Sequence, residues 1–132
     1  VLKMGGAIPA ETGAYYPITL LTDVKPGMAA FDEELFGPVF TVVTAEDEDH
    51  ALGLANQTEF GLGAAVFTAD LERGEEIARK KLHAGACFVN DFVKSDPRLP
   101  FGGIKNSGYG RELSIYGMME FVNVKTIVVN KV

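Results

Sequence analysis

The sequence predicts an α/β fold built of parallel-sheet βαβ units, because strand-like and helix-like segments alternate along the chain. Apolar, β-leaning runs at 39–43, 64–67 and 86–89 are separated by helix-like segments at about 45–60 and 70–83. The connections between these segments are short, which favours right-handed crossovers and a mainly parallel sheet.

Two strands are expected in the first third of the chain. Tyr15–Asp23 is a β-leaning run that the turn signal Lys25-Pro26-Gly27 closes. Gly37-Pro38 then precedes Val39–Val43, which is almost continuously apolar. A run of that kind suits a strand that is buried on both faces.

The first helix is expected to begin at a capping residue and to end at a glycine. Thr44 lies three residues before Asp47, which resembles a capping box, and Gly61 is placed to end the segment. Its buried stripe is expected to consist of Ala51, Leu52 and Ala55.

The second helix repeats this arrangement between Asp70 and His83. Thr68 is the expected cap, and Gly85 is a natural residue to follow the C-terminus. The expected buried face consists of Leu71, Ala78 and Leu82, with Ile77 nearer the margin.

The last third of the chain changes character. Residues 90–111 contain two prolines and several glycines, which predicts a long ordered loop of functional importance. A short helix is expected over 112–120 and a final strand over 122–129. That strand is rich in β-branched residues, so it needs a partner, since an exposed edge would invite aggregation.

Composition excludes several classes of function. The formal net charge of −6 argues against a nucleic-acid partner, because phosphate binding requires a basic face. No apolar run approaches the roughly 20 residues that span a bilayer, so we expect no membrane partner. No basic-then-apolar leader follows Val1, so we expect no signal peptide. Cys87 is the one cysteine, which favours a reducing compartment and predicts a cytoplasmic protein.

The reactive and metal-binding residue types do not form a recognisable centre. Cys87 lies in an apolar strand, where a thiol is usually buried and inert. His50 and His83 lack neighbours at metal-ligand spacing, so we expect no metal site. Gly108-Tyr109-Gly110 lacks the third glycine of a dinucleotide fingerprint.

The acidic segment around Glu34 has two interpretations, and residue chemistry alone leaves both open. Glu33 and Glu34 precede Leu35, Phe36 and the Gly37-Pro38 turn. They form either a solvated acidic turn or a site in which a carboxylate holds ligand hydroxyls and a ring packs on a flat heterocycle.

Four ordered motifs together resemble the aldehyde dehydrogenase family. The motifs are Glu34-Leu35-Phe36-Gly37-Pro38-Val39; Asn56 with Phe60 to Thr68; Gly85 with Val89-Asn90; and Pro100-Phe101-Gly102-Gly103 continuing to Gly110-Arg111-Glu112. Their order and spacing extend from about Thr12 to Val129. The loop between Asn90 and Pro100 is most similar to that of the succinate-semialdehyde dehydrogenase subgroup.

The resemblance implies a site for NAD or NADP and for an aldehyde substrate. Glu34 would bind the ribose hydroxyls next to nicotinamide, and Phe36 would pack beside the nicotinamide ring. Phe92, Ser95 and Phe101 would line the aldehyde pocket, where Ser95 and Arg98 could meet a substrate carboxylate.

The resemblance also implies a division of the chain into three parts. Residues 1–106 would be the second half of the catalytic domain, 107–121 a crossing helix, and 122–132 an oligomerisation β-arm. The 122–129 strand would then pair with a neighbouring subunit in a homo-oligomer.

No catalytic residue is assigned, because the family's cysteine nucleophile, glutamate base and oxyanion asparagine lie N-terminal to the matching region. We therefore expect the chain to be part of a larger enzyme and to be inactive on its own. One alternative is a free-standing truncated paralogue that associates with full-length subunits through 122–129. Another is a ligand-binding module that uses the Glu34–Phe36 corner alone.

Overall fold

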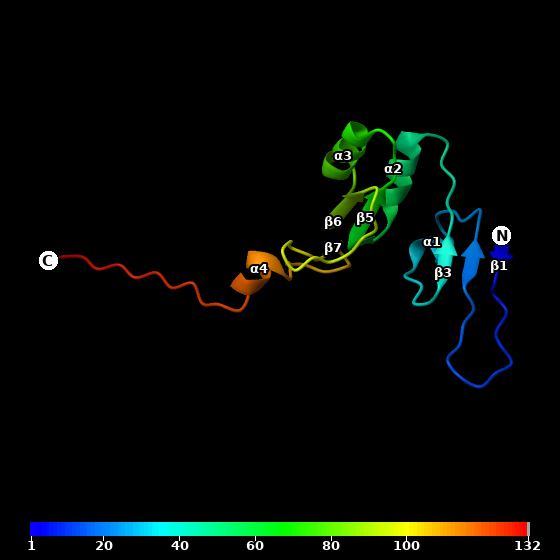
Figure 1. Cartoon of the computed structure of the whole chain (residues 1–132), viewed down its shortest axis with the longest axis horizontal. Coiled ribbons are helices and arrows are strands. Elements are labelled where there is room, and N and C mark those ends of the chain that lie inside the picture. Colours follow the sequence, from blue (N-terminus) through cyan, green and yellow to red (C-terminus); the bar gives the residue numbers. More distant parts are fainter. Residues whose placement is uncertain (132) are drawn as a thin grey trace. The chain divides into compact units, whose positions relative to one another are not determined.

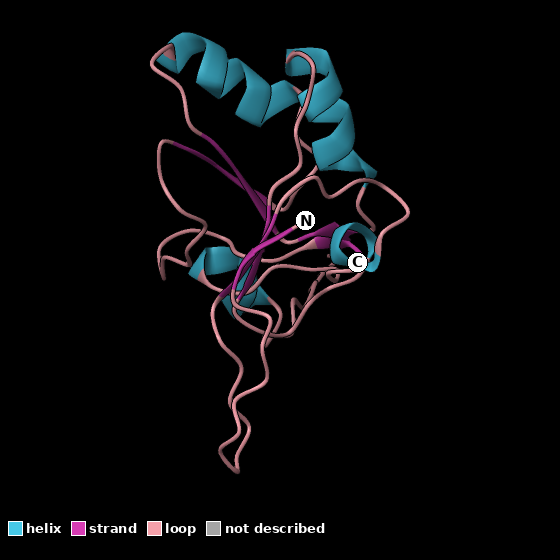
Figure 2. Ribbon diagram, turned by 90° about the vertical axis from the view of Figure 1, so that its right-hand side faces the viewer, coloured by secondary structure: helices cyan, strands magenta, loops and turns pink. Residues whose placement is uncertain are grey.

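The structure is a computed structural model that describes residues 1–131. It forms two compact units, one from Val1 to Glu59 and one from Phe60 onward. Short strands and helices joined by loops make up both units (Figure 2). Helices alternate with parallel strand pairs, so the predicted α/β class is confirmed.

The first unit contains a three-stranded sheet in the order β1-β2-β3 (Figure 1). β1 (Leu2–Met4) is antiparallel to β2 (Thr19–Leu21), and β2 is parallel to β3 (Val39–Thr41). Thr19, in the central strand, is buried, and its hydroxyl accepts from Gly6 N and donates to Pro17 O. β2 therefore lies inside the run predicted for the first strand.

β3 corrects the expectation of a strand buried on both faces. Phe40 is 62% exposed and Val42 is also exposed. β3 pairs with β2 on one edge only, and Thr41, which points to the opposite face from Phe40, is exposed as well. An apolar run shows that a strand can be buried, but the covering layers decide whether it is.

The helices of the first unit are α1 (Ala29–Asp32) and α2 (Glu48–Gln57). The cap of α2 is Asp47 and not Thr44, because Asp47 Oδ1 accepts from His50 N at 2.8 Å. Aspartate caps at least as well as threonine, and this start places two more acidic residues in the first turn.

The end of α2 and its predicted buried stripe also differ from expectation. The helix ends at Gln57, with Thr58 as its C-cap, and Gly61 belongs to the next strand. No residue of α2 is buried in the described chain, and Ala51 and Ala55 are exposed whereas Leu52 is half-buried.

The second unit contains two short sheets. β5 (Gly63–Val66) and β6 (Ala86–Val89) are parallel and in continuous register, and α3 (Leu71–Lys80) connects them. This is the predicted βαβ unit. β4 (Phe60–Gly61) and β7 (Ile104–Lys105) form a separate antiparallel pair. The parallel pairs therefore lie in different short sheets and not in one mainly parallel sheet.

α3 begins and packs differently from the sequence expectation. Its cap is Asp70, whose Oδ1 accepts from Arg73 N at 3.0 Å, while Thr68 Oγ1 accepts from Asp70 N. Ile77 is buried, at 6% exposure, and Leu71 is exposed, so the buried face is rotated toward Ile77.

Gly85 does not serve as the residue after the helix, because α3 already has its C-cap at Lys81. Its N–H donates instead to Gly61 O at 2.9 Å. A Cβ at Gly85 would lie 1.7 Å from Gly102 O, so the glycine permits close approach of two backbone segments.

The C-terminal part contains α4 (Ser114–Met119), which lies inside the predicted 112–120 helix. Within the described residues, 122–131 form neither helix nor strand, and Figure 1 draws them as an extended trace after α4. The strand expected over 122–129 is therefore not formed within the chain. Its apolar residues are exposed, Val129 to 85%, and its pairing with another subunit stays a prediction.

Little apolar surface is buried within the chain. Val24 and Ile77 are the buried hydrophobic residues in the described chain. The accessible surface is 10311 Å², whereas a folded monomer of 14.2 kDa exposes about 6,800 Å². The fold therefore offers apolar surface that further protein could cover. Across residues 1–131, no helix combines the length and apolarity needed to cross a bilayer.

Candidate functional site

The loop between α1 and β3, residues 33–38, carries both predicted cofactor residues. Gly37 N donates to Leu35 O at 3.0 Å, and Val39 N donates to Gly37 O at 2.8 Å. These successive three-residue turns hold the loop tightly folded. Phe36 is 92% exposed, and Glu34 is also exposed.

The side chains of this corner are free to meet a ligand. The Glu34 carboxylate has no hydrogen-bond partner among residues 1–131, and nothing lies within 4 Å of the position that a Cβ of Gly37 would take. A free carboxylate accepts two hydroxyl donors, and a neighbouring exposed ring offers a face to a flat heterocycle. The residues present therefore have the chemistry that a nucleoside requires.

In the second unit, Asn90 fixes the start of the loop that carries Phe92 and Ser95. Asn90 Oδ1 accepts from Thr68 N and Asn90 Nδ2 donates to Thr68 O, both at 2.8 Å. Asn90 N also donates to Val66 O, and its φ of 54° is one that asparagine tolerates. These bonds join the ends of β5 and β6 and position the residues that follow.

Phe92 and Ser95 lie on the exposed part of this loop. The Phe92 ring packs against Phe67 with a centroid distance of 5.7 Å and an interplanar angle of 57°. Ser95 is exposed, and its hydroxyl has no partner in the described part of the chain. An aromatic ring and a free hydroxyl are suited to the chain and the polar end of a small substrate.

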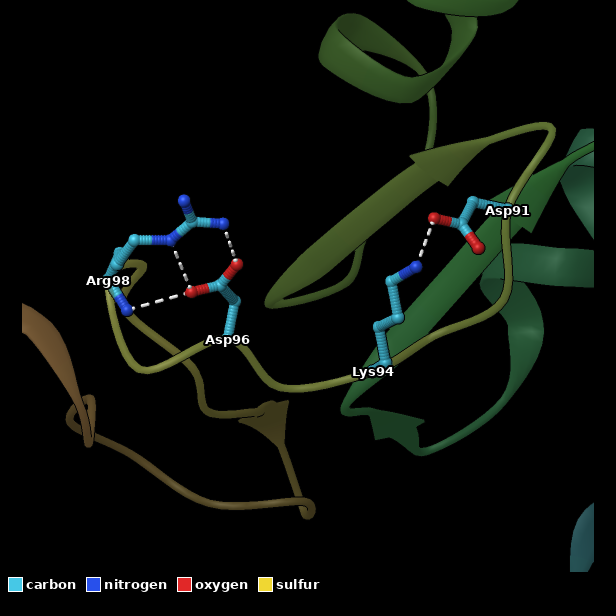
Figure 3. A network of polar contacts seen from close by, with 4 residues as sticks. All are labelled: Asp91, Lys94, Asp96 and Arg98. Atoms are coloured by element: carbon cyan, nitrogen blue, oxygen red, sulfur yellow. Dashed lines mark hydrogen bonds and ion pairs between the residues drawn. The ribbon is translucent and has the colours of Figure 1, made fainter.

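Two ion pairs flank Ser95 in the same loop (Figure 3). Lys94 Nζ lies 2.6 Å from Asp91 Oδ2, and its hydrogen bond lowers the pKa of Asp91. Asp96 accepts from Arg98 N and Nε at 2.9 Å and from Nη2 at 2.6 Å, which holds the pKa of Asp96 well below its usual range. The Arg98 guanidinium is thus already engaged by a carboxylate, a feature that the sequence did not reveal.

Phe101 is held by a backbone bridge to Glu112. Phe101 N donates to Glu112 O at 2.9 Å, and Glu112 N donates to Phe101 O at 2.8 Å. Arg111 Nη1 donates to Gly103 O at 3.0 Å and to Gly110 O at 2.6 Å. The loop around Phe101 is therefore closed on itself by its own backbone and by one guanidinium.

This loop lines an open groove of about 870 Å³ that continues along α4. Phe101 and Pro97 line the groove, whereas Phe92 and Ser95 do not. Gly61 N donates to Ser107 Oγ at 3.0 Å, which attaches the loop to β4.

The structure thus brings Glu34 and Phe36 together on one turn, and Phe92 and Ser95 together on one loop. Sequence reasoning missed the positioning roles of Asn90 and Arg111. Asn90 could have been found from its place directly after an apolar strand, but the carbonyl partners of Arg111 could not.

Cys87 does not have the environment of an activated nucleophile. It is half-buried in β6, and burial raises the pKa of its thiol. A raised pKa keeps the thiol protonated near neutral pH and therefore weakly nucleophilic. Among residues 1–131 the acidic, histidine and cysteine side chains form no cluster of three that could hold a metal ion.

Comparison with known proteins identifies the family of the chain. The aldehyde dehydrogenase family model matches residues 1–127. The chain is 48% identical over 126 residues to succinate semialdehyde dehydrogenase (NAD(P)+) Sad of Escherichia coli strain K12, covering 96% of this chain and 27% of that protein. The chain thus spans about a quarter of the length of this curated relative.

Solved structures are similar to this chain in both fold and sequence. Gox0499 superposes with a TM-score of 0.91 and 42% identity over 98% of this chain and 28% of its own. Mycobacterium tuberculosis aldehyde dehydrogenase complexed with NAD+ superposes with a TM-score of 0.84 and 35% identity over 91% of this chain and 25% of its own. The chain therefore belongs to the aldehyde dehydrogenase family, whose cofactor is NAD or NADP.

Proposed function

We propose that these residues are the C-terminal segment of an NAD(P)-dependent aldehyde dehydrogenase that oxidises succinate semialdehyde to the corresponding carboxylic acid. The observation that carries the proposal is the free, exposed Glu34–Phe36 pair on one tightly folded turn. Similarity to a relative named succinate semialdehyde dehydrogenase supports the choice of substrate.

On the cofactor side, Glu34 accepts hydrogen bonds from two neighbouring ribose hydroxyls. Phe36, two residues later, packs against the nicotinamide ring and limits its orientation. The dinucleotide held by these residues would supply the hydride acceptor for the oxidation. The role of the corner is therefore to hold and orient the cofactor and not to transfer protons.

On the substrate side, Phe92 and Phe101 provide apolar contact for the carbon chain, and Ser95 donates to the carboxylate. Support comes from the exposed Phe92 ring, the free Ser95 hydroxyl and the clamped Phe101 loop. A carboxylate pocket that uses a neutral donor avoids the desolvation of a second charge.

The nucleophile and the general base come from a region of the enzyme outside these 132 residues. The half-buried Cys87, with its raised pKa, supports this assignment, because it is poorly suited to attack a carbonyl carbon. The resemblance to the family implies a separate cysteine that forms the covalent intermediate and a glutamate that activates water.

The test follows formation of reduced cofactor from NAD+ or NADP+ with succinate semialdehyde, using the complete enzyme that carries this segment. Glu34→Ala is expected to raise the KM for the cofactor about ten-fold or more, since it removes hydrogen bonds to a charged acceptor. Glu33→Ala, its neighbour, is the matched control and should leave that KM unchanged.

Two results would contradict the proposal. One is equal cofactor KM values for the Glu34→Ala and Glu33→Ala variants. The other is loss of turnover in Cys87→Ser, which would make Cys87 the nucleophile. The 132-residue chain on its own is expected to show no turnover.

A second candidate function is association through 122–129 by a truncated paralogue that pairs with full-length subunits. The observation that favours it is the unpaired, exposed C-terminal segment. Size-exclusion chromatography with light scattering distinguishes the two cases. A chain that stays monomeric at high concentration, and does not co-elute with a full-length subunit, would exclude association.

A further inference from the structure

The segment from Asp91 to Leu99 contains an exposed stretch that is followed by a hydrogen-bonded turn. Phe92 to Ser95 are exposed. The following four residues form a turn in which Leu99 N donates to Asp96 O at 2.9 Å. Aspartate at the first position and Pro97 at the second are the residue types that favour such a turn.

The Asp96 side chain is the centre of this turn. Its Oδ1 accepts from Arg98 N and from Arg98 Nε, both at 2.9 Å, and its Oδ2 accepts from Arg98 Nη2 at 2.6 Å (Figure 3). The Asp96 side chain is only 29% exposed, whereas that of Arg98 is 87% exposed. The carboxylate therefore lies on the inner side of the turn, and the guanidinium closes it from outside.

The turn is also attached to the rest of its unit. Ser114 N, at the start of α4, donates to Pro97 O at 3.1 Å. Ser95 precedes Asp96 directly, so the two Cα atoms are about 3.8 Å apart across a trans peptide. The turn that holds Asp96 therefore limits where the backbone of Ser95 can lie.

We propose that Asp96 is a positioning residue for substrate specificity: through the turn that it closes with Arg98, it presents the Ser95 hydroxyl to the carboxylate of the substrate. This inference rests on the proposed function of the same site. Asp96 itself does not touch the substrate. The two ion pairs offset the charges of the loop, and the Ser95 hydroxyl is a neutral donor without a partner among the described residues.

Stability alone does not explain this arrangement. An exposed ion pair contributes little to folding, because water screens it and the side chains lose freedom. The position of a substrate-binding group has a larger effect, because a displacement of about 1 Å at a reacting complex can reduce turnover by about 100-fold. A weak but directional clamp can therefore have a small effect on stability and a large one on specificity.

The test compares succinate semialdehyde with butanal, which has the same number of carbons and no carboxylate, in the complete enzyme. Asp96→Ala removes all three acceptor contacts. It should lower the ratio of kcat/KM for succinate semialdehyde to kcat/KM for butanal about ten-fold, mainly through KM. Asp96→Asn keeps one acceptor for Arg98 N and should lower the ratio about three-fold.

Two further variants separate positioning from charge. Glu75→Ala removes a carboxylate that is likewise paired with an arginine, Arg79, but lies on α3 and not in this loop, and should leave the ratio unchanged. Arg98→Ala leaves the bond between Asp96 and the backbone N–H of residue 98 intact, so its effect should resemble that of Asp96→Asn.

Several results would overturn the inference. Asp96→Ala that lowers both kcat/KM values equally would reduce Asp96 to a structural role. A ratio that rises would make Asp96 a competitor of the substrate for Arg98, and a larger loss in Arg98→Ala than in Asp96→Ala would make Arg98 the direct contact. If Asp96→Ala does not fold, Asp96→Asn replaces it in the test, and an unchanged ratio of the two kcat/KM values in that variant would overturn the inference. A wild-type enzyme that oxidises neither aldehyde would instead overturn the proposed function.

Discussion

Replacing Gly85 by alanine tests the close approach between β6 and the loop that carries Phe101. An ideal Cβ at position 85 would lie 1.7 Å from Gly102 O and 2.8 Å from Gly102 C. Ordinary contact begins at 3.4 Å, so the backbone at Gly102 must move by about 1.7 Å. It cannot move freely, because Phe101, its neighbour, is paired with Glu112 in both directions.

Because the clash is with backbone and not with a flexible side chain, Gly85→Ala should destabilise the protein by about 3 kcal/mol, the upper end for overpacking. Gly53→Ala is the matched control. Gly53 lies within α2, and nothing lies within 4 Å of the position that its Cβ would take. That change should stabilise by about 1 kcal/mol, since alanine is the better helix former.

Urea unfolding of the complete enzyme, followed by circular dichroism, measures both changes. The kcat/KM of Gly85→Ala should also fall for every aldehyde, because the Phe101 loop is displaced. If Gly85→Ala unfolds at the same urea concentration as Gly53→Ala, the close approach of Gly85 to Gly102 is refuted.

Three further predictions concern single residues. Asp47→Ala should destabilise by about 1 kcal/mol and Thr44→Ala by less than about 0.5 kcal/mol in urea unfolding, because Asp47 is the observed cap of α2; equal losses would contradict that assignment. Cys87 should react with a thiol reagent at pH 8 more slowly than free cysteine, because burial raises its pKa and depletes the thiolate. Urea should abolish the difference, and fast labelling of the folded protein would contradict the burial. Asn90→Ala should destabilise by about 2 kcal/mol in urea unfolding, since it removes both bonds to Thr68 and leaves alanine at a positive φ; Asn90→Gly, which tolerates that φ, should lose less, and the opposite order would contradict the reasoning.

The positions of the two strands on either side of α3 could be predicted because they depend on local pattern. The runs at 64–67 and 86–89 are apolar, short and bounded by polar or glycine residues, and both form strands in parallel register. The cap residues could not be predicted to the residue. Thr44 competes with Asp47, and Thr68 with Asp70, within one helical turn, where the capping energies of threonine and aspartate are similar.

The order of the motifs selected Glu34 and Phe36 as cofactor residues, and their role stays a prediction. The structure shows that both are exposed and lie on one turn. The engagement of Arg98 by Asp96 was not evident, because a guanidinium two residues from a carboxylate can equally point into solvent.

By itself, the sequence determined the family, the α/β class and the residue types available for cofactor and substrate. These follow from composition, period and motif order, all of which are local along the chain. The tertiary structure alone decided that Gly85 serves a backbone contact with Gly102, that Ile77 and not Leu71 is buried, and that Phe40 in β3 is exposed. The physical reason is that burial and close approach depend on contacts between segments far apart in the sequence. A local sequence pattern does not specify those contacts.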